Sequence, residues 1–407
     1  MLIILIGALK LVSFFSPLLL NKVSSSLEAF GVFEYSFNLG QILMPLLGMG
    51  LSGGYAFYVL KHRQNYMKTA FHFHFVLLTA LALLSVFIYP KILDNIYYGA
   101  CLIALSFANQ VFISGLKKIE DKNYASVFVE SGLYVILMAT VLTFVLFEIT
   151  FNFQLWFLSL LIYNCLLSVI YHRKHIKFKE IKKKHLIQMY LFGVMAMTAG
   201  MLVFLLCTST RVFTSFFLNN IAVGHYSLIF RIGAASILIY KAVIILIYKN
   251  LYLSDFTFLD KMFIRIIIGV ILVNILLFPL FPHISNLFID KTDMPTQIDN
   301  RLILTIFLQI ILWVNFSLLE PIFQRENILK QQIAMISMAV LVMFFSMWFI
   351  HSYSELELLD ICLINNIMIS ITTVFALFYL KRKKIILKKT LTISIIMLLI
   401  TITNSVI

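Results

Sequence analysis

The stretch "HRKHIKFKEIKKKH", residues 172–185, carries seven Lys and Arg residues and lies near the middle of the chain. On each side of it the sequence is a series of apolar runs of about 20 residues, the length that an α-helix needs to cross a bilayer. Lys and Arg gather in the cytoplasmic loops of membrane proteins. The stretch therefore predicts a cytoplasmic linker between two groups of membrane-spanning helices.

The composition excludes a water-soluble fold. Of the 407 residues, 61% are hydrophobic and 12% are charged, whereas a soluble domain is roughly half apolar and about a quarter charged. The four cysteines lie inside apolar runs without metal-ligand spacing, so we interpret them as small buried hydrophobic residues. They are Cys101, Cys165, Cys207 and Cys362. The sequence predicts neither a metal site nor a cofactor.

Twelve runs are predicted to cross the membrane. They are residues 1–21, 35–60, 69–89, 96–116, 123–147, 153–171, 186–208, 220–248, 262–281, 301–323, 329–350 and 358–380. A thirteenth run, 391–407, is short, and two alternatives stay open for it: it crosses the membrane or lies at the interface. The predicted fold is an all-α polytopic membrane protein with twelve, or thirteen, transmembrane helices in two pseudo-symmetric six-helix lobes. The predicted domains are 1–171, the linker 172–185, 186–380, and a basic tail with a short apolar segment, 381–407.

The placement of the basic residues predicts a cytoplasmic N-terminus. With that orientation, 23 of the 32 Lys and Arg residues fall in cytoplasmic loops and five fall outside. The net charge of +14 is then a topology signal, and it does not require nucleic acid as a partner. The linker 172–185 is also expected to attract anionic membrane lipids, by about 1 kcal/mol for each Lys or Arg near the surface.

Two decapeptides indicate an internal repeat. "GVFEYSFNLG" begins at Gly31 and "GHYSLIFRIG" begins at Gly224, at an offset of 193 residues. The offset pairs glycine with glycine at both ends of the decapeptide, and aromatic residues at two positions between them. Each stretch enters the second helix of its lobe. A parallel repeat of this kind is common in secondary transporters, whose substrate site lies between the repeats.

Several polar side chains interrupt the apolar runs and are the candidate site. An ionisable residue at mid-bilayer costs roughly 2.5–3.5 kcal/mol, so it usually faces a water-filled cavity or a partner. The candidate cavity residues are Lys10, Glu34, Asn38, Gln41, Arg211, Arg231 and Lys241. Arg231 and Lys241 are about 80° apart around one helix and about 15 Å apart along it. Alternatives are that Lys10 snorkels to the interface and that Arg211 is an interfacial anchor.

Two further sets of residues lie outside this group. Glu130 is a candidate for ion coupling, with a structural ion pair as the alternative. His72 and His74 are two residues apart, so they diverge around a helix, and we interpret them as ordinary interior or interface residues.

Phosphate is the cargo group that the cationic candidates favour. Guanidinium binds phosphate with two hydrogen bonds and Lys adds a point charge. A lipid-linked diphosphate would suit cations at several depths, with its tail in the bilayer and its head in the cavity.

The stretch "STRVFTSFFLNNIAVGHYSLIFRIG", residues 209–233, resembles Wzx-type O-antigen flippases, polysaccharide transporters of the multidrug/oligosaccharidyl-lipid/polysaccharide exporter superfamily. Residues 25–58 carry its counterpart, including the "GMGL" turn at 48–51. Relatives often have an acid directly before the arginine at the outer end of span seven, where this chain has Thr210 before Arg211.

The resemblance implies that the chain flips an undecaprenyl-diphosphate-linked oligosaccharide, such as an O-antigen unit for lipopolysaccharide biosynthesis, across the bacterial inner membrane. It implies alternating access between two six-helix lobes, and a polysaccharide polymerase as a further partner. Three alternatives remain. One is a lipid flippase for a peptidoglycan or teichoic precursor, and another is a cation-coupled multidrug exporter of the same superfamily. The third is a membrane-embedded O-antigen polymerase or ligase, but the sequence shows no nucleophile–base pair or phosphate loop, so we expect no enzyme.

Overall fold

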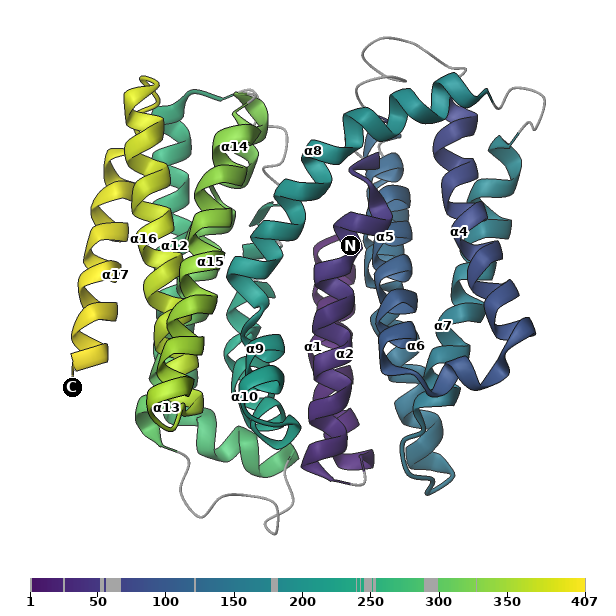
Figure 1. Ribbon diagram of the computed structural model, residues 1–407, viewed down its shortest axis with the longest axis horizontal. Coiled ribbons are helices and arrows are strands. Elements are labelled where there is room, and N and C mark those ends of the chain that lie inside the picture. Colours follow the sequence, from purple (N-terminus) through teal and green to yellow (C-terminus); the bar gives the residue numbers. More distant parts are fainter. Residues whose placement is uncertain are drawn as a thin grey trace. The chain divides into compact units, whose positions relative to one another are not determined.

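The computed structural model consists of helices, and the part of the chain that it describes contains no β-strand (Figure 1). The described residues are 2–406 except 25, 52–54, 56–66, 121, 177–181, 239, 242, 245–250, 252–253, 289–298 and 327. Within them, nine helices are long and apolar enough to cross a membrane. The chain is therefore an all-α, multi-pass membrane protein.

The helices form two compact units. One contains Met1–Ser25 and Tyr35–Phe204, and the other contains Ser26–Glu34 and Leu205–Ile407. The chain passes from one unit to the other just before helix α2 (Leu27–Gly48), again inside α2, and a third time inside helix α8 (Lys183–Thr208). The predicted division of the chain at the linker 172–185 stays a prediction.

The first unit is built from the helices of the N-terminal half. They are α1 (Leu2–Val23), α2 (Leu27–Gly48) from Tyr35 onward, α4 (Lys68–Ile88), η3 (Pro90–Asp94), α5 (Ile96–Ile119), α6 (Asn123–Leu146), α7 (Phe153–Leu167), η4 (Ser168–His172), η5 (Arg173–His175) and α8 (Lys183–Thr208) up to Phe204. Helix α6 packs along α1 and α5, and α7 packs on α5. Large apolar side chains such as Phe71, Phe112 and Trp156 are completely buried in this bundle.

The second unit contains the start of α2 and the helices of the C-terminal half. The latter are α9 (Thr210–Phe217), α10 (Asn220–Gly233), α12 (Phe256–Phe288), α13 (Asn300–Ser317), α14 (Glu320–Arg325), α15 (Leu329–Tyr353), α16 (Leu358–Arg382) and α17 (Lys388–Val406). Helix α16 lies against α13, α15 and α17, and Figure 1 shows α16 and α17 side by side in yellow.

Helix α2 begins eight residues before its predicted start at 35. The Ser26 hydroxyl accepts a hydrogen bond from the Ala29 N–H (3.2 Å), as a serine at a helix N-cap does. The helix ends at Gly48 because Met49 and Gly50 have φ angles of 46° and 59°, in the left-handed region that terminates helices. Residues 52–54 and 56–60 of the predicted span lie outside the described residues. Because α2 starts early, Glu34 lies inside the helix.

Predicted span seven is followed by a break and a further short helix. Ser209 separates α8 from α9, and its hydroxyl donates to the carbonyl of Leu205. Such serine-to-backbone bonds compete with the helical ladder and bend helices. Helix α10 then begins after Asn219, whose side chain accepts from the Ala222 N–H (2.8 Å). The break places Arg211 on α9 rather than at the end of a continuous span.

The glycines that open the two decapeptides pack at one helix crossing within the second unit. A Cβ added to Gly31 would overlap the Asn220 carbonyl oxygen, and a Cβ on Gly224 would lie 2.7 Å from the Leu27 carbonyl oxygen. Leu27 and Asn220 are themselves related by the offset of 193. The contact is therefore reciprocal between equivalent positions, and it requires glycine because the two backbones touch.

The glycines that close the decapeptides also pack alike. A Cβ on Gly40 would lie 2.6 Å from Ile103 of α5, and one on Gly233 would lie 2.7 Å from Ile310 of α13. Helices α5 and α13 correspond to the fourth predicted span of each half. Each unit, taken by itself, thus packs its second helix on its fourth through a glycine.

The thirteenth apolar run folds as α17, which is an integral part of the second unit. Asp260 of α12 accepts hydrogen bonds from the backbone N–H groups of Lys389 and Thr390 (3.0 and 2.9 Å), and so caps the start of α17. Farther along, Asn315 of α13 donates to Ser394 (2.8 Å). These contacts tie the helix to the bundle at more than one level.

A buried polar chain crosses the interior of the first unit. The Nδ1 atoms of His72 and His172 are 2.9 Å apart, and His172 Nε2 lies 3.1 Å from Asn109 Oδ1. Asn109 donates to Asn164 (2.9 Å), which donates to the Leu160 carbonyl (2.9 Å). The short π-helical turn η4 follows α7 and places His172 in this chain. The prediction of an ordinary interior residue is thus confirmed for His72, which is 1% exposed.

Candidate functional site

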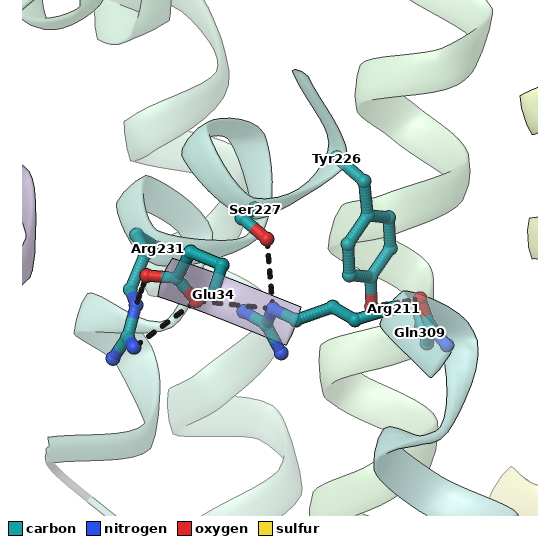
Figure 2. Close-up of polar contacts among 6 residues, drawn as sticks. All are labelled: Glu34, Arg211, Tyr226, Ser227, Arg231 and Gln309. Atoms are coloured by element: carbon teal, nitrogen blue, oxygen red, sulfur yellow. Dashed lines mark hydrogen bonds and ion pairs between the residues drawn. The ribbon is translucent and has the colours of Figure 1, made fainter. Parts of the chain in front are cut away.

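One carboxylate and two guanidinium groups meet in the second unit. Figure 2 shows Glu34 between Arg211 and Arg231. Glu34 Oε1 lies 2.9 Å from Arg231 Nε, and Oε2 lies 3.2 Å from Arg231 Nη2 and 3.1 Å from Arg211 Nε. Arg231 thus makes the two-bond contact that is typical of arginine with a carboxylate. We call these three residues the charged triad.

Three short helical segments position the triad. Glu34 comes from the first half of α2, Arg211 from α9 and Arg231 from the last turn of α10. Their side chains are 1%, 5% and 14% exposed, respectively. The glycine crossing described above brings α2 against α10, so that Glu34 reaches Arg231.

Arg211 is surrounded by groups that orient its guanidinium. Its Nε–H donates to the hydroxyl of Ser227 (2.8 Å), one turn before Arg231 on α10. The guanidinium carbon lies 4.6 Å from the ring centre of Phe230 and 5.3 Å from that of Tyr226. Cation–π contacts of this kind contribute about 0.5–2 kcal/mol. The surroundings hold Arg211 in place from one side while Glu34 engages it from the other.

A neutral polar chain continues from Tyr226. The Tyr226 hydroxyl donates to Gln309 Oε1 (2.9 Å), and Gln309 Nε2 donates to Thr210 (2.6 Å) and to Asn365 Oδ1 (2.5 Å). Asn365 in turn donates to the Leu206 carbonyl (3.1 Å). The chain links α9, α10, α13 and α16 and places Thr210, directly before Arg211, in a hydrogen-bonded position.

Electrostatics explains why the three charges are buried together. A single buried charge would lose its hydration without compensation, whereas an opposite charge with good hydrogen-bond geometry offsets much of that loss. Removing one partner of a buried pair typically costs about 3–5 kcal/mol. Glu34 therefore stabilises both arginines inside the bundle.

The other predicted cavity residues lie outside the triad. Lys241 is exposed and Gln41 is half-buried. The side chain of Lys10 lies outside the described part of the structure, although its backbone belongs to α1. Asn38 is 1% exposed and, among the described residues, its amide nitrogen and oxygen have no hydrogen-bond partner.

Glu130 belongs to the first unit, whereas the triad belongs to the second. It is half-buried on α6 and accepts a long hydrogen bond from Ser114 of α5 (3.4 Å). Ser114 also contacts Ser126 (2.9 Å). The structure thus places Glu130 beside hydroxyl groups of the α5–α6 pair.

Sequence reasoning missed two features of the site. We included Glu34 among the candidate cavity residues but did not predict that it is the acidic partner of both arginines. We also overlooked Gln309 and Asn365, each an amide within an otherwise apolar run. A lone amide in a spanning segment is a usable signal, because it must find a partner there.

Two hollows occur on other parts of the second unit. One, of about 600 Å³, is lined by Val374, Phe375, Phe378, Lys381 and Arg382 of α16. The other, of about 490 Å³, is lined by Val342, Phe345, Ser346, Phe349 and Ile350 of α15. In the described ranges, no cluster of three or more His, Cys, Asp or Glu side chains could hold a metal ion.

Comparisons with known protein families, curated proteins and solved structures found no match to this chain.

Proposed function

We propose that this protein flips an undecaprenyl-diphosphate-linked oligosaccharide, of the O-antigen type, from the cytoplasmic to the periplasmic face of the bacterial inner membrane. The observation that carries the proposal is the convergence of Arg211 and Arg231 on one oxyanion, the carboxylate of Glu34, inside an apolar bundle. Apolar side chains alone would pack such a bundle at lower cost.

The recognition chemistry is that of phosphate. The two-bond contact of guanidinium with a carboxylate uses the same planar fork with which arginine binds phosphate oxygens. Arg231 makes this contact, and Arg211 adds an ion pair to the same carboxylate from another helix. A diphosphate presents several oxygens, so it can engage both arginines.

The internal repeat supports alternating access between two six-helix halves. The decapeptides at 31 and 224 pack through equivalent glycines, and each second helix packs on its fourth helix in the same manner. Repeats of this kind are common in transporters, where one half moves against the other around a fixed site. We propose twelve spanning helices, six in each half, for this reason.

The topology supports the direction of transport. The bias of Lys and Arg favours a cytoplasmic N-terminus and a cytoplasmic linker 172–185. Anionic lipids are the proposed partners of that linker, and a polysaccharide polymerase is a proposed downstream partner. The candidate site residues are the charged triad together with Lys10, Asn38, Gln41 and Lys241.

An acid in the site also bears on a competing function, the export of cationic drugs. A carboxylate available for a cationic drug would favour that function. Glu34, however, is engaged by two guanidinium groups with distances of 2.9–3.2 Å, so the charges around it favour an anionic cargo.

Replacement of Arg231 tests the proposal. We expect Arg231→Ala to reduce surface polysaccharide in a flippase-null host by about tenfold or more, since a charge-assisted hydrogen bond contributes about 1.5–3 kcal/mol. Arg265→Ala is the matched control, because Arg265 is exposed on the apolar helix α12. Normal display by Arg231→Ala at a normal protein level would remove Arg231 from the site.

Glu130 is the proposed residue for ion coupling, supported by its place beside Ser114 and Ser126. We expect Glu130→Gln to weaken the dependence of polysaccharide display on the proton or sodium gradient, because the variant has no charge to gain or lose. Display would be measured while each gradient is dissipated separately. An unchanged dependence on both gradients would exclude the role.

A further inference from the structure

We propose that Glu34 is an internal competitor of the cargo: its carboxylate occupies the place between Arg211 and Arg231 that a phosphate group of the cargo takes on binding. The inference rests on the proposed function and adds how the same site is regulated.

The two arginines hold the carboxylate of Glu34 in the way that they would hold a phosphate group. Both oxygens of Glu34 are engaged: Arg231 contacts Oε1, and both arginines contact Oε2. This is how two oxygens of a phosphate group would be held by the same guanidinium groups. Because Glu34 and phosphate are both anionic, binding one in this place disfavours the other.

Loss of the Glu34 carboxylate would leave two buried positive charges close together. Two guanidinium groups that are 5% and 14% exposed would then face one another without their shared carboxylate. Buried like charges repel, and the removal of one partner of a buried ion pair is costly. An added oxyanion would restore the compensation, so loss of Glu34 should make the protein bind phosphate groups more tightly.

Glu34 lies at the point of α2 where the chain passes from the second unit to the first. It is the last residue of the segment Ser26–Glu34 that belongs to the second unit, and the chain enters the first unit at Tyr35, within the same helix α2. Exchange of Glu34 for a cargo phosphate therefore acts at a point where the chain passes from one unit to the other. Such an exchange can link cargo binding to a change of conformation, because the cargo then binds the two states differently.

The experiment measures the binding of inorganic pyrophosphate to the purified full-length protein in lipid nanodiscs. For Glu34→Gln we expect an affinity for pyrophosphate about tenfold or more above that of the wild type. The variant should also unfold at a lower temperature without pyrophosphate and gain more thermal stability from it than the wild type does. Glu28→Gln is the matched control, because Glu28 is an exposed acid on the same helix, and its affinity should equal that of the wild type.

A second variant covers the case in which Glu34→Gln does not fold. Glu34→Asp keeps the charge but is one methylene shorter, so it should hold the two arginines less well and give an intermediate gain in affinity. If the folded Glu34 variants bind pyrophosphate no more tightly than the wild type, while Arg231→Gln weakens binding, the competition is refuted and the proposed function stands. If pyrophosphate binds none of them, or if Arg231→Gln leaves binding unchanged, the oxyanion site itself is refuted.

Discussion

At the scale of single residues, a backbone group that can only accept a hydrogen bond fixes the donor and acceptor roles of the buried side chains linked to it. In the first unit the Leu160 carbonyl can only accept, so Asn164 must turn its NH₂ group toward it. The Asn164 Oδ1 then accepts from the NH₂ group of Asn109, which leaves Asn109 Oδ1 to face His172. His172 Nε2 must therefore carry the proton that it donates to Asn109. His172 Nδ1 accepts from His72 as a result. One backbone carbonyl thus assigns the tautomers of two histidines.

The polar chain gives a prediction at this scale. His172→Leu should lower the stability of the protein, because it leaves Asn109 Oδ1 and the His72 Nδ1–H without partners, at about 1–3 kcal/mol for each buried group. The measurement is the thermal unfolding of the purified protein in detergent. His283→Leu, an exposed position of α12, should change the unfolding temperature little. Equal unfolding temperatures for the two variants would contradict the hydrogen-bonded chain.

At the scale of helices, glycine determines which elements can approach. The α2–α10 crossing in the second unit brings backbone against backbone at Gly31 and Gly224. Any side chain larger than a hydrogen atom would separate the helices, and Glu34 would then move away from Arg231. The repeat therefore has a direct mechanical consequence for the charged triad.

Gly31→Ala tests this consequence. We expect a loss of stability of about 1–3 kcal/mol or more, because the new methyl group overlaps the Asn220 carbonyl oxygen. Gly269→Ala is the control: nothing lies within 4 Å of the added Cβ, and alanine is about 0.5–1 kcal/mol better than glycine inside a helix. Thermal unfolding should therefore separate the variants in opposite directions. A neutral Gly31→Ala would show that the crossing is not close.

At the scale of the whole molecule, the two ends of α4 in the first unit lie next to different short helices, η5 at one end and η3 at the other. Thr69 near the start of α4 donates to the His175 carbonyl of η5 (3.3 Å), whereas η3 follows the other end of α4. Lys174 and Lys91 lie in η5 and η3 and are both exposed. They therefore report on opposite ends of a helix that is 21 residues long, which is enough to cross a bilayer.

Cysteine labelling tests the orientation. In a background without the four native cysteines, a membrane-impermeant maleimide should label Lys91→Cys in intact spheroplasts. It should label Lys174→Cys only after the membrane is permeabilised. The physical reason is the preference of Lys and Arg for the cytoplasmic side. The reverse pattern would invert the topology and with it the proposed direction of transport.

The sequence by itself determined the class of fold. Nine of the ten predicted spans from 69–89 to 358–380, all except 220–248, correspond to described helices that are long and apolar enough to cross a membrane, because hydrophobic length is a local property of the chain. The predicted start of α2 was wrong: the predicted span begins at residue 35, directly after the acid Glu34, whereas the helix begins at Leu27. A helix can include Glu34 once a partner is present, and that partner is not local.

Only the tertiary structure decided which charges meet. Glu34 and Arg231 are 197 residues apart, and their pairing depends on a helix crossing that two distant glycines permit. The sequence predicted that Glu34 lines a cavity, but no spacing rule relates it to α9 and α10. Burial then fixes the pairing, because in an apolar interior each charge needs a compensating neighbour at hydrogen-bond distance.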